Sequence, residues 1–343
     1  MGSEKRTLIV FDTNKLRSVV KGEPSYGSFE FSEEFEQVNN FIKEVKLADL
    51  VKMAIPRIVV EELLKQKIEQ YETDLKDFHS IKERLSMLPN TSFVGMTLPG
   101  NDFNCSENLK QLLNEFILKN NINIIEFPDD QLSEIFKNII KRAIDKKSPF
   151  KQKGNSSDSG FKDVLIWESI LNYNALDNYN KVIMISNDSG FDECISEFES
   201  IVKKYFVLTP SVDYVKEEIN KDYDSIIQKN KFLDFVNNDY FKDHIAKELS
   251  QLNSIIFDEK DCSIESARVI DYIDSVDYFK EEETGAELIT IISLVKCNID
   301  VEGVNREILV KAKTYLDESK GIDYTDFEVV GNEGNEGNQI QTN

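Results

Sequence analysis

Short apolar runs alternate with longer amphipathic stretches through the first 210 residues of this 343-residue chain. The runs are TLIVFD (7–12), KMAIP (52–56), INIIEF (122–127), KVIMIS (181–186) and YFVLTP (205–210). Such short runs are typical of buried parallel strands. The stretches between them predict helices over 33–50, from Pro56 to about 85, over 109–118, from Asp129 or Asp130 to 144, over 161–176 and over 190–203. This alternation predicts an α/β fold with a central parallel sheet that helices cover on both faces.

The sequence changes character after Pro210. Residues 1–210 hold 33 acidic and 27 basic side chains, residues 211–343 hold 30 and 14, and the whole chain has a formal net charge of -22. Residues 211–253 have helical character, and from Ser263 onward the alternation of apolar and polar residues favours half-exposed antiparallel strands. We therefore predict an α/β domain over 1–210, a C-terminal α+β accessory domain with antiparallel strands over 211–330, and a disordered Gly-Asn-Glu tail over 331–343.

The scarcity of cysteine and histidine excludes several kinds of site. Four scattered cysteines without a C-x-x-C motif argue against a zinc ribbon or a disulfide framework. Two histidines give little support to Ser-His or Cys-His catalysis. No apolar run approaches the roughly 20 residues of a membrane-spanning helix, and the N-terminus lacks the apolar core of a secretory signal. We expect a soluble, cytoplasmic protein with no membrane partner.

Carboxylates are abundant, and four of them lie where predicted strands end or predicted helices begin. Asp12 ends the first strand in VFDTN, and Asp188 follows the fourth in MISNDSGF. Glu62 lies six residues after Pro56, and Asp163 begins the helix GFKDVLIW. Open α/β sheets bind ligands at the carboxyl ends of their strands, and carboxylates bind hard divalent cations. We therefore expect the four acids to converge on one site.

The stretches around these acids resemble the PIN-domain nuclease family. They are IVFDTNKL (9–16), AIPRIVVEEL (54–63), GFKDVLIWESIL (160–171) and VIMISNDSGF (182–191), and they occur in the family's order across about 200 residues. The resemblance implies a compact PIN-like α/β/α sandwich that cleaves RNA with the help of metal ions. The family's acid positions fall on Asp12, Glu62, Asp163 and Asp188.

The chain is closer to a PIN-like subgroup with additional C-terminal sequence than to the short toxins of the family. KSPF followed by GFKD supports this assignment. The chain departs from the compact form around residues 21–40 and 72–120 and throughout the region after 210. A role as a bacterial toxin or in antiviral defence is an expectation at the level of the family only.

The implied chemistry explains why acids gather. Clustered carboxylates repel one another, and divalent cations relieve that repulsion. Two cations roughly 4 Å apart activate a water and stabilise the leaving oxygen of a phosphodiester, without histidine. We expect Mg²⁺, with Mn²⁺ as a substitute. Asp192 is a further candidate metal ligand, and Asn14 and Ser186 are candidates to support the site through hydrogen bonds.

Each acid also has a purely structural interpretation. Asp12 and Asp188 suit caps of helices or turns, and Asp163 suits the first turn of a helix because of the helix dipole. Glu62 suits an exposed position on a helix. We interpret its neighbour Glu61 as such an exposed residue. Four such coincidences in the family's order are less probable than one shared site.

Basic residues concentrate in the segment that precedes Asp163. The net charge argues against broad binding of nucleic acid, but local patches decide where phosphates bind. The segment predicts RNA contacts from Arg142, Lys146, Lys147, Lys151, Lys153 and Lys162. The alternative is a solvated loop, in which we expect Asp158 to lie. Phe150 suits either stacking on a base or anchoring this segment to the core, and Trp167 suits the core.

Two other functions compete with a nuclease. A haloacid-dehalogenase-type phosphatase needs a second Asp two positions after the first, where this chain has Asn14. A catalytically inactive PIN-like scaffold that binds RNA or protein is the serious alternative, although a scaffold has no use for four mutually repelling acids. The acidic region after 210 favours a protein partner or self-association over RNA. The sequence leaves open which RNA is cut and whether DNA is cut as well.

Overall fold

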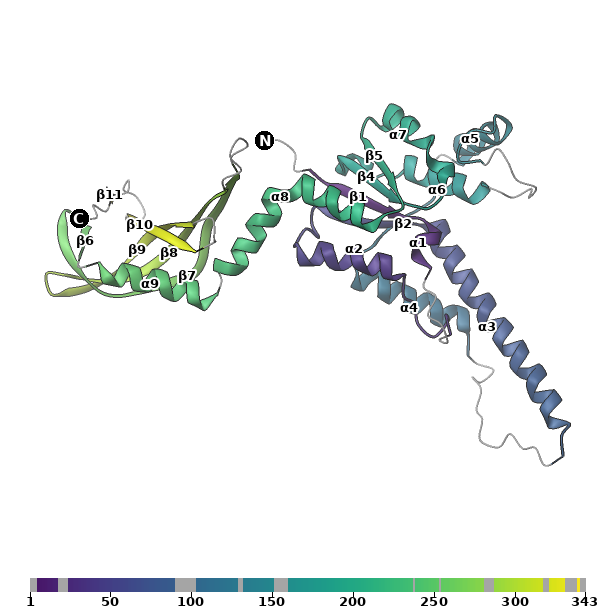
Figure 1. Ribbon diagram of the computed structural model, residues 1–343, viewed down its shortest axis with the longest axis horizontal. Helices are drawn as coiled ribbons and strands as arrows, with labels where there is room; N and C mark the ends of the chain where they lie inside the picture. Colours follow the sequence, from purple (N-terminus) through teal and green to yellow (C-terminus); the bar gives the residue numbers. More distant parts are fainter. Residues whose placement is uncertain are drawn as a thin grey trace. The chain divides into compact units, whose positions relative to one another are not determined.

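The computed structural model describes residues 5–17, 24–89, 103–128, 132–150, 160–236, 238–252, 254–280, 287–316, 321–330 and 338–339 (Figure 1). The chain divides into two compact units, Met1–Asp222 and Tyr223–Asn343. Helix α8 (Val212–Val236) crosses this division, and its backbone leaves helical geometry at Tyr223, where φ is -124° and ψ is 16°. Each unit has a sheet of its own.

The first unit is built on a five-stranded parallel sheet with the strand order β3-β2-β1-β4-β5. Its strands are β1 (Thr7–Phe11), β2 (Val51–Pro56), β3 (Asn123–Ile125), β4 (Lys181–Ile185) and β5 (Tyr205–Thr209). The register pairs Phe11 with Ile185 and Val10 with Ala54, so the carboxyl ends of the three middle strands lie at one edge. All five residues of β1 are buried, as expected of a central parallel strand.

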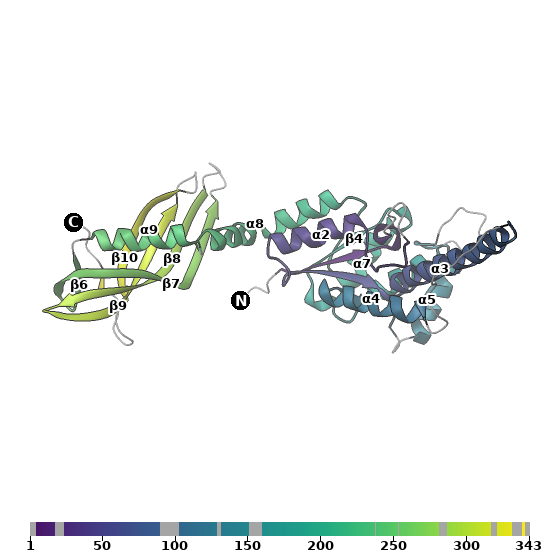
Figure 2. The same cartoon turned by 90° about the horizontal axis from the view of Figure 1, so that it is seen from below.

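Helices cover both faces of this sheet. They are α1 (Thr13–Leu16), α2 (Glu33–Glu44), α3 (Arg57–Ser86), α4 (Cys105–Lys119), α5 (Leu132–Ile144), α6 (Phe161–Leu171) and α7 (Cys194–Val202). Figures 1 and 2 show α2 and α4 on one side of the sheet and α6 and α7 on the other. This three-layer arrangement confirms the predicted PIN-like α/β/α sandwich.

Local capping explains where several helices differ from their predicted limits. Helix α6 ends at Leu171 rather than near 176, because Asn172 Nδ2 donates to the Glu168 carbonyl at 2.8 Å and closes the last turn. Two short 3₁₀ turns are η1 (Leu176–Asn178), which overlaps the predicted helix 161–176 only at Leu176, and η2 (Ser189–Phe191), which includes the predicted start of the helix 190–203. The predicted caps Asp129 and Asp130 lie outside the described residues.

Helix α3 is 30 residues long, which corresponds to roughly 45 Å. Its buried residues are Val59, Val60 and Leu63, all in its first two turns. The strand β2 ends at Pro56, directly before the helix, in agreement with the predicted start. Neither α3 nor any other helix in the described part of the chain is long and apolar enough to cross a lipid bilayer.

The second unit contains an antiparallel sheet with the order β11-β10-β9-β8-β7-β6. Its elements are α9 (Asp239–Gln251), β6 (Ser254–Phe257), β7 (Lys260–Lys280), β8 (Glu287–Val301), β9 (Val304–Leu316), β10 (Ile322–Val330) and β11 (Asn338–Gln339). The unit has its own core, in which Phe241, Ile245 and Leu249 of α9 join Ile289 and Val295 of β8. This confirms the predicted α+β region with antiparallel strands.

The predicted disordered tail, 331–343, lies outside the described residues except for β11. There Asn338 pairs with Val329 and Gln339 pairs with Glu328 in antiparallel register. Val269, Ile289, Ile291 and Val295 are buried in the core of the second unit.

The first half of α8 contributes to the first unit beyond residue 210, where the sequence analysis placed the domain boundary. Val215 and Ile219 of α8 are buried. Lys181, at the start of β4, forms ion pairs with Glu218 at 2.8 Å and with Asp222. These contacts tie this part of the helix to the parallel sheet.

We predict that a fragment of residues 1–222 is more stable than a fragment of residues 1–210. The shorter fragment loses the burial of three aliphatic side chains, those of Val212, Val215 and Ile219, worth about 1.5–3 kcal/mol each, and leaves Lys181 without Glu218 and Asp222. Its melting temperature, followed by circular dichroism, should be lower by several degrees. Equal melting temperatures would place the boundary at residue 210.

Candidate active site

Asp12 follows the central strand β1, and only 3% of it is exposed. Its backbone N–H donates to the Ile185 carbonyl at 3.1 Å, beside the end of β4. One carboxylate oxygen accepts from the Thr13 backbone N–H at 2.7 Å and the other from Ser186 Oγ at 2.9 Å. Burial raises the pKa of this carboxyl; the two hydrogen bonds oppose the rise, and the charges of Asp188 and Glu62 add to it.

Asp188 is joined to Asp12 through Ser186, which supports the site as the sequence analysis expected. Ser186 Oγ donates to Asp12 and accepts from the Asp188 backbone N–H at 3.0 Å. The Asp188 carboxylate accepts from the Gly190 N–H at 2.8 Å and caps η2. A Cβ atom at Gly190 would lie 3.1 Å from Asp188 Oδ1 and 3.3 Å from the Pro149 carbonyl. A larger residue here would therefore require Asp188 or residue 149 to shift by a few tenths of an ångström.

Glu62 approaches the same edge from α3. Its Oε2 accepts from Thr13 Oγ1 at 3.0 Å, and its Oε1 accepts from Gln66 Nε2 at 3.2 Å. Two cations face it: Lys162 Nζ lies 3.0 Å and Arg17 Nη2 lies 3.9 Å from Oε1. The structural interpretation of Asp12 and Asp188 as caps is therefore correct as well, but neither residue is only a cap, because both belong to a network that reaches Glu62.

The remaining candidate residues are placed as follows. Asp163 is partly buried in the first turn of α6, directly after Lys162, which brings this turn beside α3. Asp192 follows η2 and is exposed, as are Asn14 and Glu61. The structure thus links Asp12, Glu62 and Asp188 through the hydrogen bonds of Ser186 and Thr13, and it sets Asp163 one residue from a partner of Glu62.

Sequence reasoning missed three residues that contact Glu62. Thr13 directly follows Asp12, and Gln66 lies four residues after Glu62, a spacing that places both side chains on one helix face. Only Gln66 carried a local signal, its spacing from Glu62, because Thr13 contacts Glu62 across 49 positions of the sequence. Arg17 carried none, because its contact with Glu62 joins two segments that are 45 positions apart in the printed sequence.

The donor chemistry of this edge fits a hard divalent cation, since every candidate ligand offers carboxylate oxygen. Among the residues that the structure describes, no three acidic, histidine or cysteine side chains are grouped closely enough to hold a metal ion. Mg²⁺ usually takes one or two carboxylates and completes its shell with water and substrate phosphate oxygens. An open site that includes Asp12 and Asp188 is therefore compatible with Mg²⁺.

Arg142 corrects one prediction, because it is buried and does not face solvent for RNA. Only 6% of its side chain is exposed, and it pairs with Glu168 at 3.3 Å and with Glu197 at 2.9 Å. A further guanidinium nitrogen donates to the Ser148 carbonyl. Arg142 therefore ties α5 to α6 and α7, and removing it would take from the buried Glu168 carboxylate the cation that pairs with it.

The other basic residues of the segment differ in their exposure and in whether they form ion pairs. Lys146 is exposed, Lys147 pairs with Glu197 at 2.6 Å, and Lys151, Lys153 and Asp158 lie outside the described residues. Phe150 packs against the cluster of Ile135, Ile139 and Val164, which supports the anchoring interpretation. Trp167 is fully buried, as expected.

Comparison with known families gives one match. A family model described as a PIN domain matches residues 9–191. No curated protein and no solved structure matches the chain. The matched range covers more than half of the chain and contains Asp12, Glu62, Asp163 and Asp188, whereas Asp192 and the second unit lie beyond it.

We predict that Asp12→Asn stabilises the metal-free protein at neutral pH. Folding raises the pKa of the Asp12 carboxyl. The stability that the protonated carboxyl gives is therefore lost as the pH rises through the pKa of the folded state. Above that pH the buried negative charge opposes folding. The gain from the substitution should be present at about pH 8 and shrink toward about pH 4, near the unfolded pKa. Urea unfolding in EDTA measures it.

Asp213→Asn is the matched control, because Asp213 is an exposed first-turn residue of α8. It should change stability little at either pH. A lower free energy of unfolding for the Asp12→Asn variant than for the wild type at about pH 8 would contradict the prediction.

Proposed function

The chain belongs to the PIN-domain family, and on that premise we propose that its first unit is a metal-dependent endoribonuclease. PIN domains are generally nucleases, and they typically use divalent metals. The observation that carries the proposal is the buried Asp12 carboxylate at the carboxyl edge of the sheet, linked through Ser186 to Asp188. Neighbouring anions with little solvent need a cation, and phosphodiester hydrolysis is the chemistry that such a cation supports best.

In this proposal Asp12, Glu62, Asp163 and Asp188 hold Mg²⁺ or Mn²⁺, and Asp192 contributes from the outer side. The cations supply an activated water and stabilise negative charge at the cleaved phosphate. Ser186 and Thr13 orient the ligands: Ser186 fixes one oxygen of Asp12, and the Thr13 hydroxyl fixes one oxygen of Glu62. Ligands that are held in this way need little rearrangement when the cation binds.

RNA is the proposed substrate, and Lys162 is the proposed phosphate contact nearest to the acids. Its side chain is 60% exposed although it pairs with Glu62. An exposed ion pair contributes about 0–1 kcal/mol, so a phosphate can recruit this ammonium group at small cost. The proposed contacts farther along the RNA are Lys146, Lys147, Lys151 and Lys153.

We predict that Asp188→Asn and Asp12→Asn each lower RNA cleavage more than about a hundredfold, since each removes a proposed metal ligand. Cleavage of a labelled single-stranded RNA should require Mg²⁺ or Mn²⁺ and stop in EDTA. Asp213→Asn should cleave at the wild-type rate. Wild-type rates in both site variants would contradict the site, and cleavage in EDTA would contradict the metal.

A second prediction concerns the basic segment. Replacing Lys146, Lys151 and Lys153 with Ser should weaken RNA binding and flatten its salt dependence. Each lost phosphate contact should reduce the slope of log K against log salt by about 0.7. Fluorescence anisotropy with a labelled RNA in EDTA measures both quantities.

The control for this prediction replaces three exposed lysines of α8 and α9 with Ser, namely Lys229, Lys231 and Lys247. It removes the same charge from another part of the chain. An equal loss of slope in the two triple variants would show that net charge, and not the segment before α6, governs the binding.

A further inference from the structure

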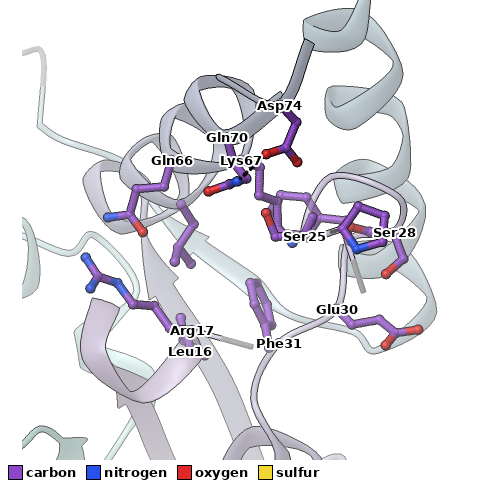
Figure 3. A pocket seen from close by; sticks show the side chains of 13 residues that line it. Leu16, Arg17, Ser25, Ser28, Glu30, Phe31, Gln66, Lys67, Gln70 and Asp74 are labelled. Atoms are coloured by element: carbon purple, nitrogen blue, oxygen red, sulfur yellow. Dashed lines mark hydrogen bonds between the residues drawn. The ribbon is translucent and has the colours of Figure 1, made fainter. Parts of the chain in front are cut away.

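A cavity of about 410 Å³ lies beside Glu62, between α3 and the segment 24–31 (Figure 3). Leu16, Phe31 and Leu63 give it an apolar floor. Its volume lies within the range of about 300–1,000 Å³ that is usual for small-molecule sites. The proposed chemistry makes no use of this cavity.

One wall of the cavity is a row of polar side chains on α3. Gln66, Gln70 and Asp74 are spaced by four residues, so they share one face of the helix. Figure 3 shows this row on one side of the cavity, with Phe31 on the opposite side. The cavity thus combines an aromatic surface with hydrogen-bonding groups, the two features by which proteins bind unstacked bases of RNA.

The cavity is held open by contacts between its two walls. Lys67 of α3 donates to the carbonyls of Ser25 and Ser28, the latter at 3.3 Å, and its ammonium lies 5.2 Å from the centroid of the Phe29 ring. Burial lowers the pKa of Lys67. These contacts fix the segment 24–31 on α3, so a ligand would find the walls already ordered.

Two residues that line the cavity also contact Glu62 of the candidate active site. Gln66 donates to Glu62 at 3.2 Å, and Arg17, which also lines the cavity, lies 3.9 Å from the same oxygen. One helical turn, about 5.4 Å, separates Glu62 from Gln66 along α3. A group in the cavity therefore lies next to the place where the proposed cleavage occurs.

The polar wall is rich in hydrogen-bond acceptors. Gln66 and Gln70 each direct an amide N–H toward a carboxylate, that of Glu62 at 3.2 Å and that of Asp74 at 2.8 Å. These bonds fix the amide orientation, and the amide carbonyl oxygens then join the carboxylates of Glu30 and Asp74 as acceptors around the cavity. The two cations that also line the cavity already have partners, Lys67 in the carbonyls of Ser25 and Ser28 and Arg17 in Glu62. The acceptors of the wall therefore favour a ligand that donates.

We propose that this cavity receives one base of single-stranded RNA beside the cleaved bond and favours a base with an exocyclic amino group over uracil. Adenine, cytosine and guanine carry such a donor, and glutamine and aspartate side chains are common partners of the amino groups of adenine and cytosine. The proposal rests on the nuclease function and adds a preference of the same site for particular bases.

The first experiment maps cleavage of a pool of short random RNAs by the full chain with Mg²⁺. Sequencing of the new ends should show uridine depleted at one position beside the cut, by about fivefold or more. Gln70→Ala/Asp74→Asn should abolish this depletion, and Asp74→Asn alone should reduce it. Equal use of all four bases by the wild type would overturn the proposal.

The matched control is Gln111→Ala/Asp77→Asn. Gln111 donates to Glu115 on α4 at 2.9 Å with the same four-residue spacing, and Asp77 is exposed on α3 three residues beyond Asp74. Neither residue lines the cavity. The control should keep the uridine depletion of the wild type, and thermal unfolding should show that all variants are folded.

A second experiment separates this proposal from the nuclease function. AMP, CMP, GMP and UMP are titrated into the full chain in EDTA, and binding is followed by saturation-transfer NMR. The first three should bind more tightly than UMP, and Gln70→Ala/Asp74→Asn should remove the difference. No difference in the wild type would overturn the base preference. Such a difference in a chain that cleaves no RNA would contradict the nuclease function and leave the base preference standing.

Discussion

A buried carboxylate at the end of the central strand is the constraint on which the candidate site depends. Asp12 has lost most contact with water, which opposes its ionisation. Two neighbours compensate, the Thr13 N–H and the Ser186 hydroxyl, and each also positions another acid. Ser186 holds the backbone before Asp188, and the Thr13 hydroxyl holds Glu62. The two residues that stabilise the charge of Asp12 therefore also contact Asp188, which follows β4, and Glu62, which lies on α3.

Burial also decides which basic residues of this acidic chain are available to the proposed RNA substrate. Lys162 pairs with Glu62 while 60% of its side chain is exposed, so water has already weakened that pair and a phosphate can replace it. Arg142 is buried among two carboxylates, and extracting it would cost about 3–5 kcal/mol. Both residues belong to one basic stretch of the sequence, yet only Lys162 is placed to exchange partners.

The difference between Lys162 and Arg142 shows which parts of the structure could be predicted from the sequence. Periodicity predicted the five parallel strands, because each strand leaves a local pattern, and the ends of parallel strands meet at one edge whatever joins them. Asp12, Asp188 and Glu62 could be found in this way. The partners of Arg142 could not, because Glu168 and Glu197 lie 26 and 55 positions away and no local pattern encodes such pairs. The first unit extends past residue 210 for the same reason, since Lys181 and Glu218 pair across 37 positions.

Helix α3 links catalysis and recognition in the proposed nuclease through its periodicity. Glu62, Gln66, Gln70 and Asp74 follow one another at four-residue intervals, which places them in one slowly drifting row, because four residues turn an α-helix by slightly more than a full circle. The first member faces the acids of the sheet, and the others line the cavity. Since Val59, Val60 and Leu63 are buried, the start of the helix cannot rotate without opening the core. The packing that positions the proposed metal ligand thus also fixes the row of acceptors that we propose reads the base.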